Sequence, residues 1–185
     1  MNDKKEFLLS YGSEKYHDKL AKDKDPEVRT EIANIGNKKH LDKLVNDKDY
    51  EVRSIVAQHG HEEHLDKLVH DSEPMVRNAV VYYGHKKHVD KLVNDPSNHV
   101  RRSVARKGHK DHLDKLVNDS DTYVRAIVAD HGHKDHLDKL VNDPSSIVRH
   151  NVTQTGHKDH LEKLINDEDL TVRNSAKRKL KELNK

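Results

Sequence analysis

Residues 40–63 read HLDKLVNDKDYEVRSIVAQHGHEE, and residues 112–135 read HLDKLVNDSDTYVRAIVADHGHKD. The two segments agree at most positions, and the same pattern recurs every 24 residues without insertion. A fixed period of roughly 20–50 residues is typical of architectures that stack small repeated units. The frame restarts at Tyr16, His40, His64, His88, His112, His136 and His160.

Each repeat is predicted to form two helices. In the first half Leu41, Leu44 and Val45 have the i, i+3, i+4 spacing of one helical face, and Val52 and Val56 continue the apolar pattern in the second half. These two helices are called helix A and helix B below. The same apolar positions recur in each later repeat, so the prediction applies along the chain.

Glycine and proline mark the ends of these helices. All seven glycines share one repeat position, where a left-handed residue would end helix B without a Cβ penalty. The sequence Asp25-Pro26-Glu27 combines an N-cap residue, a first-turn proline and a first-turn acid, so helix B should begin there. The glycines are Gly12, Gly36, Gly60, Gly84, Gly108, Gly132 and Gly156, and the prolines at the turns between helices are Pro26, Pro74, Pro96 and Pro144.

No single repeat can be stable alone. About six aliphatic side chains contribute roughly 1.5–3 kcal/mol each, which cannot offset the ordering of 24 residues at about 1.5 kcal/mol each. Stacking is therefore required, and we predict an all-α, right-handed α-solenoid (superhelix) of seven helix pairs forming a single domain, 1–185. Its parts are an N-terminal half-repeat cap 1–15, repeats 16–39, 40–63, 64–87, 88–111, 112–135 and 136–159, and a last repeat 160–185 whose second helix is extended as a C-terminal cap.

Composition narrows the function. The chain is 37% charged and 32% hydrophobic with a net charge of +2, and it contains no cysteine, which excludes disulfides and thiolate sites. The apolar run Phe7-Leu8-Leu9 is too short for a signal peptide or a membrane span. We therefore expect a cytoplasmic protein with no membrane partner.

Every repeat also carries an aspartate and an arginine six residues apart, as in residues 71–77, DSEPMVR. This pattern resembles the HEAT-like α-solenoid repeat family, and the 24-residue length is closest to its leucine-rich repeat variant subtype. The resemblance implies a polar ladder between successive repeats, in which an aspartate at the turn takes hydrogen bonds from a half-buried arginine. The implied ladder residues are Asp47, Arg53, Asp71, Arg77, Asp95, Arg101, Asp119, Arg125, Asp143 and Arg149.

The chain departs from the catalytic members of this family. Leucine-rich repeat variants can carry an iron–sulfur cluster on an added cysteine segment, and this chain has no cysteine. The His-Glu pairs that hold iron in HEAT-like deoxyhypusine hydroxylase follow the Val-Arg step, where this chain has His150-Asn151 or Ser54-Ile55 instead. We therefore expect a non-catalytic protein without a cofactor.

The 17 histidines include five H-x-x-H pairs, and each pair could offer two nitrogens to Zn²⁺ or Ni²⁺ from one helix face. Two imidazoles alone make a weak site, and the sequence suggested a third ligand, Glu62 or Glu63, only at the first pair. We expect no metal and give as weak candidates His61, His64, His85, His88, His109 and His112.

A structural role for the histidines is favoured instead. Ser13 and Asn37 replace the first histidine of the pair in the early repeats, and both are N-cap residues, so we expect that histidine to cap helix A. The second histidine should pack between neighbouring layers. Because a helix N-terminus and like neighbours disfavour imidazolium, we also predict that stability falls below about pH 6.

Some helix B positions differ from repeat to repeat and form one helical stripe at i, i+3 and i+7. The resemblance places helix B on the concave surface of the solenoid. We predict a protein partner there, because aromatic residues, Met and Arg are enriched in interfaces; the alternative is a solvated surface that is free to vary. The predicted binding residues are Met75, Asn78, Tyr82, Tyr83, His99, Arg102, Arg106, Tyr123, Asp130, Ile147 and His150.

Nucleic acid is the rival partner. Arg101, Arg102, Arg106 and Lys107 form a basic cluster, but phosphate binding needs a sustained positive track. The acidic residues Glu27, Glu51 and Asp130 interrupt the same varied stripe of helix B. Protein is therefore the favoured partner, and a metal-dependent role is the third possibility.

Overall fold

The computed structural model describes residues 13–155 and 157–184 of the chain, and all the regular structure in these ranges is helical. This confirms the predicted all-α helical-repeat fold, while the handedness, the exact number of repeats and the single domain stay predictions. One compact unit ends at Leu92 and the next begins at Val93, and each is described by itself. Most of the predicted cap 1–15, together with Gly12 and Gly156, lies outside the described residues.

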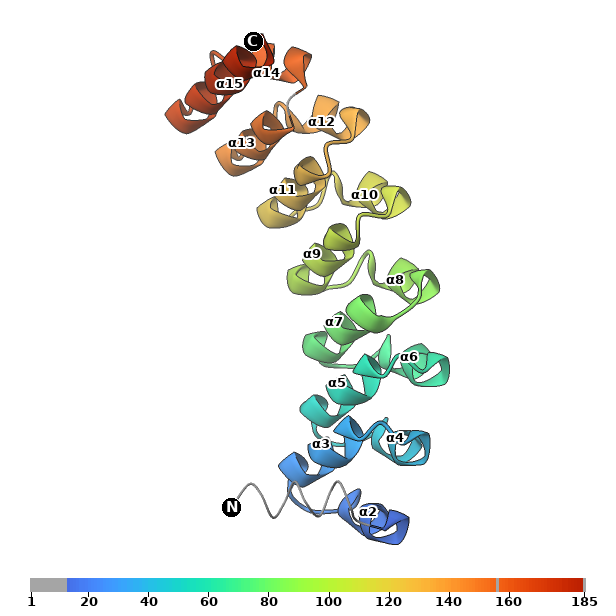
Figure 1. Ribbon diagram of the computed structural model, residues 1–185. Helices are drawn as coiled ribbons and strands as arrows, with labels where there is room; N and C mark the ends of the chain where they lie inside the picture. The colour runs from blue at the N-terminus through green and yellow to red at the C-terminus, as the bar shows by residue number, and fades with distance from the viewer. Residues whose placement is uncertain (1–12, 156, 185) are drawn as a thin grey trace, which may run out of the picture. The chain divides into compact units, whose positions relative to one another are not determined.

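In the first unit, seven-residue A helices alternate with B helices of nine or ten residues. Successive B helices pack against each other and against the A helices beside them, which gives two rows (Figure 1). The helices are α2 (Glu14–Leu20), α3 (Pro26–Asn34), α4 (Lys38–Leu44), α5 (Tyr50–Gln58), α6 (Glu62–Leu68), α7 (Pro74–Tyr83) and α8 (Lys86–Leu92).

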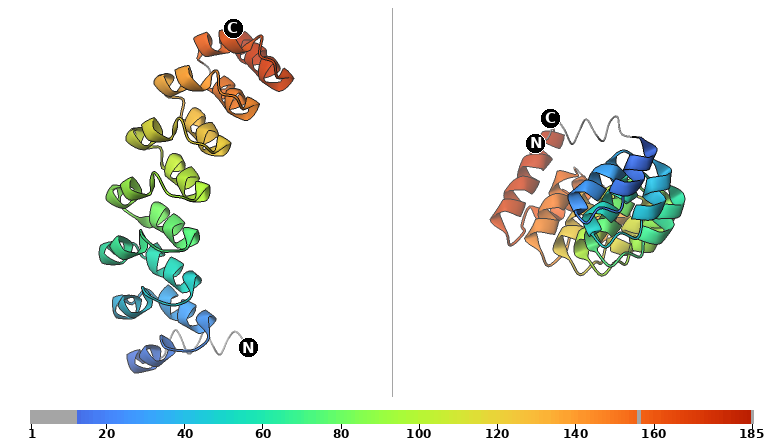
Figure 2. Two further views of the ribbon diagram at one scale, coloured as in Figure 1. Left: turned by 180° about the vertical axis from the view of Figure 1, so that it is seen from behind. Right: turned by 90° about the horizontal axis from the view of Figure 1, so that it is seen from below.

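The second unit repeats this arrangement, and its B helices again form one row, seen from behind in Figure 2. Its last helix has 14 residues, in agreement with the predicted extension of the final helix B. The helices are α9 (Asn98–Lys107), α10 (Lys110–Leu116), α11 (Thr122–Asp130), α12 (Lys134–Leu140), α13 (Ser146–Gln154), α14 (Lys158–Leu164) and α15 (Leu170–Leu183).

The core lies between the two rows in each unit. Leu41, Leu44 and Val45 of the A segment and Val52 and Val56 of helix B are all buried, as the spacing predicts. The corresponding positions of the later repeats are buried as well, except for the half-buried Ile165 in the last repeat. Among the described residues, no helix combines the length and apolar character needed to cross a bilayer.

The helix ends follow the predicted punctuation with one exception. Asp25 accepts a hydrogen bond from the Glu27 amide at 3.0 Å, and Pro26 is the first residue of α3. Gly36, Gly60, Gly108 and Gly132 all have φ between 69° and 76°. Gly84 differs: it ends α7 on extended backbone with φ −82° and ψ 162°, whereas Gly108 ends the equally long α9 in the left-handed conformation. The prediction of a left-handed glycine is therefore wrong at that position.

Candidate functional site

Five ladder arginines reach from helix B to the next repeat within their own unit. Arg53 Nε and Nη2 donate to Asp71 Oδ2 and Oδ1 at 2.6 and 2.8 Å, a two-point contact between planar groups. Arg53 Nη1 donates to the Asp47 carbonyl oxygen at 2.7 Å. Within one repeat, the arginine therefore contacts the backbone carbonyl of the aspartate six residues before it. The carboxylate of Asp71 instead binds the arginine of the preceding repeat. The same two-point contact joins Arg29 to Asp47, Arg101 to Asp119, Arg125 to Asp143 and Arg149 to Asp167.

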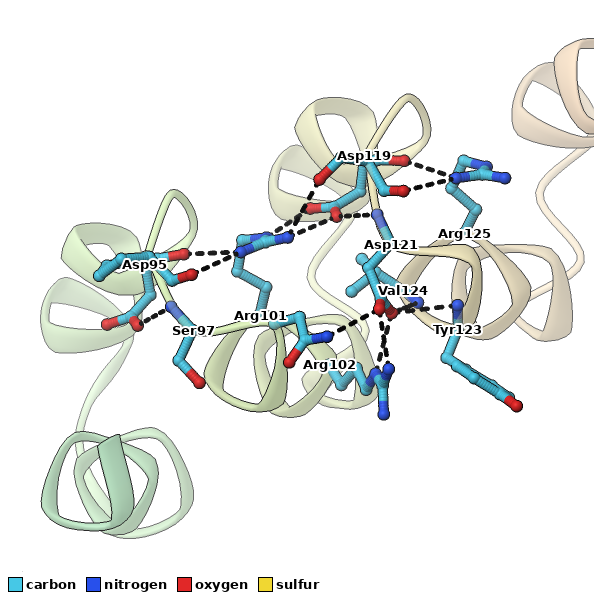
Figure 3. A network of polar contacts seen from close by, with 12 residues as sticks. Asp95, Ser97, Arg101, Arg102, Asp119, Asp121, Tyr123, Val124 and Arg125 are labelled. Carbon is cyan, nitrogen blue, oxygen red and sulfur yellow. Dashed lines mark hydrogen bonds and ion pairs between the residues drawn. The ribbon is translucent and has the colours of Figure 1, made fainter. Parts of the chain in front are cut away.

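The other ladder residues contribute backbone contacts within their own repeats. Arg77 Nη1 donates to the Asp71 carbonyl oxygen at 2.7 Å. Asp95 accepts the Ser97 amide on Oδ1 at 2.8 Å, and its carbonyl oxygen accepts Arg101 Nη1 at 2.9 Å (Figure 3). The ladder thus orders these A–B turns as well as junctions between repeats within each unit.

Burial makes the ladder charges interdependent. The side chains of Arg53 and Asp71 are 12% and 7% exposed. Burial alone would raise the pKa of the Asp71 carboxyl, but hydrogen bonds from Arg53 and the Glu73 amide hold that pKa below its ordinary value. Removing either charge would leave the other nearly buried and unpaired, which is costly.

A second set of contacts joins successive A helices, and sequence reasoning missed it. The ring of His64 is buried, and its Nε2 lies 2.7 Å from Asp42 Oδ1 in the preceding repeat. Because a carboxylate only accepts, Nε2 carries the proton. The signal was present as an aspartate two residues after the histidine in most repeats. The same contact joins His40 to Asp18, His88 to Asp66, His136 to Asp114 and His160 to Asp138.

The predicted capping role of the first histidine in each pair is wrong. His61, His109 and His133 occupy the N-cap position, yet their rings make no capping hydrogen bond. Asn37 does cap, since its short side chain accepts the Lys39 amide at 3.0 Å. The bulkier imidazole instead lies edge-on to the second histidine of its pair, with ring centroids 5.2–5.4 Å apart. The second histidine packs in the interior, as predicted.

The varied stripe of the B helices is exposed at its outer positions only. Its middle position is buried at Ser54 and Ala126 and half-buried at Asn78, Arg102 and His150. We define the early row as Glu27, Glu51 and Met75 in the first unit and His99, Tyr123, Ile147 and Thr171 in the second, all exposed. We define the late row as Asn34, Gln58 and Tyr82 in the first unit and Arg106, Asp130, Gln154 and Arg178 in the second, also exposed.

Large apolar side chains in these rows and beside them are exposed rather than packed. In the first unit Met75, Tyr82 and Tyr83 are 55%, 48% and 50% exposed, and all three lie on α7. In the second unit Tyr123 and Ile147 are 52% and 45% exposed. The described interior therefore does not cover these five large side chains.

Tyr123 is held in place by its neighbours. Arg102 Nε and Nη2 donate to Asp121 Oδ1 and Oδ2 at 2.9 and 2.8 Å (Figure 3), and the guanidinium carbon lies 4.6 Å from the Tyr123 ring centroid. Asp121 also accepts the Tyr123 amide at 3.1 Å. The hydrogen bond from Arg102 is the main reason that the pKa of Asp121 lies far below its usual range. An aromatic ring braced in this way loses little entropy on binding.

The predicted basic cluster is partly neutralised. Arg101 is bound to Asp119 in the ladder, and Arg102 is bound to Asp121. Arg106 is exposed on the late row. Because phosphate groups would have to compete with carboxylates for Arg101 and Arg102, these contacts weaken the nucleic-acid alternative.

Asp130 stands out on the late row. The structure gives its carboxylate no hydrogen bond or ion pair among the described residues. Partial desolvation of the Asp130 carboxyl group raises its pKa, and the smaller electrostatic effect of His131 acts in the opposite direction. A positively charged group on a partner would stabilise the ionised carboxylate of Asp130.

Two shallow cavities lie between α13 and α15, and His150 lines both. Their volumes are 390 and 280 Å³. Sequence reasoning missed the α15 side of these cavities because it treated the last repeat only as a cap. Three of the missed residues lie one 24-residue repeat after Ile147, His150 and Gln154, so the repeat pattern could have identified them. The missed residues are Leu170, Thr171, Asn174 and Arg178.

No protein-family model and no curated protein matches this chain. Among solved structures, a leucine-rich repeat variant with a repetitive structural motif superimposes with a TM-score of 0.84, at 28% identity over 93% of this chain and 73% of that one. The chain is an α-helical repeat protein. Escherichia coli YibA shares the fold of this helical-repeat protein, with a TM-score of 0.59 at 17% identity over 96% of this chain and 85% of YibA.

Proposed function

We propose that this helical-repeat protein is a non-catalytic interaction protein, an adaptor, scaffold or inhibitor, that binds a protein partner along the early and late rows of its B helices. The observation that carries the proposal is the exposure of Met75, Tyr82, Tyr83, Tyr123 and Ile147 on the B helices. Aromatic residues and Met are enriched in protein interfaces, and Tyr is enriched among the residues that contribute most of the binding energy.

The distribution of tyrosine supports this proposal. The chain has six tyrosines, and Tyr50, Tyr82, Tyr83 and Tyr123 are exposed on B helices. From the second repeat onward the buried apolar side chains are mainly Leu, Val and Ala, so these rings are not needed for stacking. Their amphipathic character suits a surface that alternates between solvent and a partner.

The charges around the rows suggest the chemistry of the partner. Asp130 is partly desolvated, and Glu27 and Glu51 extend the acidic character on the early row of the first unit. A partner segment that combines basic and apolar side chains would pair with the acids and cover the rings.

Site-specific photo-crosslinking tests the proposal. A photoreactive residue at Tyr82 or Tyr123 should capture a defined protein in an extract of the native host, whereas the same residue at Lys67, exposed on an A helix, should not. With the captured protein in hand, Tyr123→Ala should weaken binding by about 30-fold, the effect of a 2 kcal/mol interface residue. Equal capture from Lys67, or no capture from either row, would refute the proposal.

A gel shift separates protein from nucleic acid. Binding through phosphates would be strong at about 50 mM salt, weak at about 200 mM, and reduced by Arg106→Ala. We expect no retardation at low salt. A salt-dependent shift that Arg106→Ala abolishes would favour the nucleic-acid alternative.

A further inference from the structure

Three side chains at the start of α14 converge in the second unit. His157, Asp159 and His160 each place one potential ligand atom within 4.8 Å of the other two. The two imidazole rings lie nearly perpendicular, with centroids 5.5 Å apart. Sequence reasoning named a third possible ligand only at Glu62 or Glu63, and it missed Asp159 as a further candidate.

Hydrogen bonds fix which nitrogen of each ring is protonated. His157 Nε2 lies 3.0 Å from the Gly132 carbonyl oxygen, and His160 Nε2 lies 2.8 Å from Asp138 Oδ1. Both partners can only accept, so both Nε2 atoms carry protons and both Nδ1 atoms carry lone pairs. This is the arrangement by which outer carboxylates and carbonyls orient metal-binding histidines.

No group donates a hydrogen bond to the Nδ1 atom of His160. The side chain is fully buried, and Nδ1 has no hydrogen-bond partner. The nearest charged atom is Asp159 Oδ1 at 3.5 Å, so two lone-pair-bearing atoms face each other. A cation between them would satisfy both.

One of the two H-x-x-H pairs in the first unit lacks these features. His85 and His88 are separated by two lysines, Lys86 and Lys87, so no acid follows the first histidine. His88 Nδ1 already accepts the His85 amide at 3.1 Å. This pair is therefore a built-in control for nonspecific binding to histidine.

We propose that His157 Nδ1, Asp159 Oδ1 and His160 Nδ1 form a site for one divalent transition-metal ion such as Zn²⁺. Two imidazoles and one carboxylate are a ligand set that Zn²⁺ accepts, with water at the remaining position. Asp138 and the Gly132 carbonyl are the positioning groups. Lys134 is the competitor, because its ammonium pairs with Asp159 and must move aside when the ion binds.

Calorimetric titration of the untagged full chain with Zn²⁺ tests the site. His157→Asn, which places at this position the residue that Asn37 supplies in an earlier repeat, and Asp159→Asn should each weaken the tightest binding step at least about tenfold. Asp138→Asn should also weaken it about tenfold through His160. Lys134→Gln should strengthen binding because it releases Asp159, and His85→Asn should change nothing.

Two results would overturn the proposal. One is equal loss of affinity in His85→Asn and His157→Asn, which would mean diffuse binding to the many histidines. The other is a ¹⁵N spectrum in which one equivalent of Zn²⁺ leaves the His160 Nδ1 resonance unmoved. Circular dichroism of every variant checks that the helices remain, and the exposed Asp159 makes Asp159→Asn the variant least able to disturb the core.

Discussion

Asp71 illustrates how a single ladder carboxylate stabilises two parts of the structure. It accepts two hydrogen bonds from Arg53 and one from the Glu73 amide, so one side chain orders a junction and a turn together. Exposed pairs such as Lys38 with Asp42 have half-exposed side chains and contribute much less.

We therefore predict a large difference between two substitutions. Asp71→Asn should lower the free energy of unfolding by about 3 kcal/mol, because it leaves the Arg53 guanidinium nearly buried without its counter-charge. Lys38→Ala, the control, should cost less than about 1 kcal/mol. Urea denaturation followed by circular dichroism measures both, and equal costs would contradict the ladder as a stabilising device.

The buried histidines give a residue-scale prediction about proton position. His64 and His136 should appear as Nε2–H tautomers at neutral pH, because Nε2 faces Asp42 in one case and Asp114 in the other. Their Nδ1 atoms have no hydrogen-bond partner. Long-range ¹H–¹⁵N correlation spectra distinguish the tautomers, and Nδ1–H forms at these two residues would contradict the assigned contacts.

At the scale of helices, the glycine after helix B couples one repeat to the next. The Gly108 Cα leaves room for the His131 ring, whose Nε2 lies 2.8 Å from the Ala105 carbonyl oxygen at the end of α9. A Cβ at Gly108 would lie 2.7 Å from His131 Cε1. At Gly132, which has a similar positive φ, the nearest side-chain atom would be 3.9 Å away.

These two glycines form a matched pair for mutation. Gly132→Ala should cost about 1–2 kcal/mol from its left-handed backbone alone. Gly108→Ala should cost about 1 kcal/mol more, because His131 must move and give up its hydrogen bond. Thermal unfolding of the two variants measures the difference, and equal losses would show that the His131 contact contributes nothing.

At the scale of the whole molecule, many carboxyl groups have lowered pKa values. Hydrogen bonds from His64, His136 and His160 lower the pKa of their aspartate partners, and a hydrogen bond from Arg149 does the same for Asp167. An unfolded aspartate titrates near pH 3.9. Below about pH 5 the unfolded chain therefore binds more protons than the folded chain, and stability is lost as the pH falls through the folded values.

Thermal melts at about pH 7.5, 5.5 and 3.0 test this linkage. We expect a large loss between the last two values, caused by the carboxylates. An unchanged melt at pH 3.0 would contradict the carboxylate prediction.

The repeat frame made the helices and the core predictable, because Leu41, Val52 and their equivalents recur at one spacing. Contacts between repeats were harder to predict. Periodicity shows that a histidine and an aspartate recur, but only coordinates show that His64 reaches back to Asp42. Asn37 suggested that the histidines at the same repeat position also cap helix A. This was wrong because the larger imidazole ring does not place an acceptor atom where the short Asn37 amide does. Helical spacing did not show that the middle position of the varied stripe is partly covered, because it does not show where the neighbouring helix lies; the binding role of Asn78, Arg102 and His150 stays a prediction.

The two sets of contacts run in opposite senses along the chain. Within each unit, an arginine binds the aspartate of the following repeat, whereas a histidine binds the aspartate of the preceding one. A 24-residue cassette duplicated or deleted in phase would therefore find complementary groups on both sides, so gene duplication could change the length of such an array. Arg173 Nη1 donates to the Glu168 carbonyl oxygen of its own repeat, and Arg173 has no carboxylate partner among the described residues.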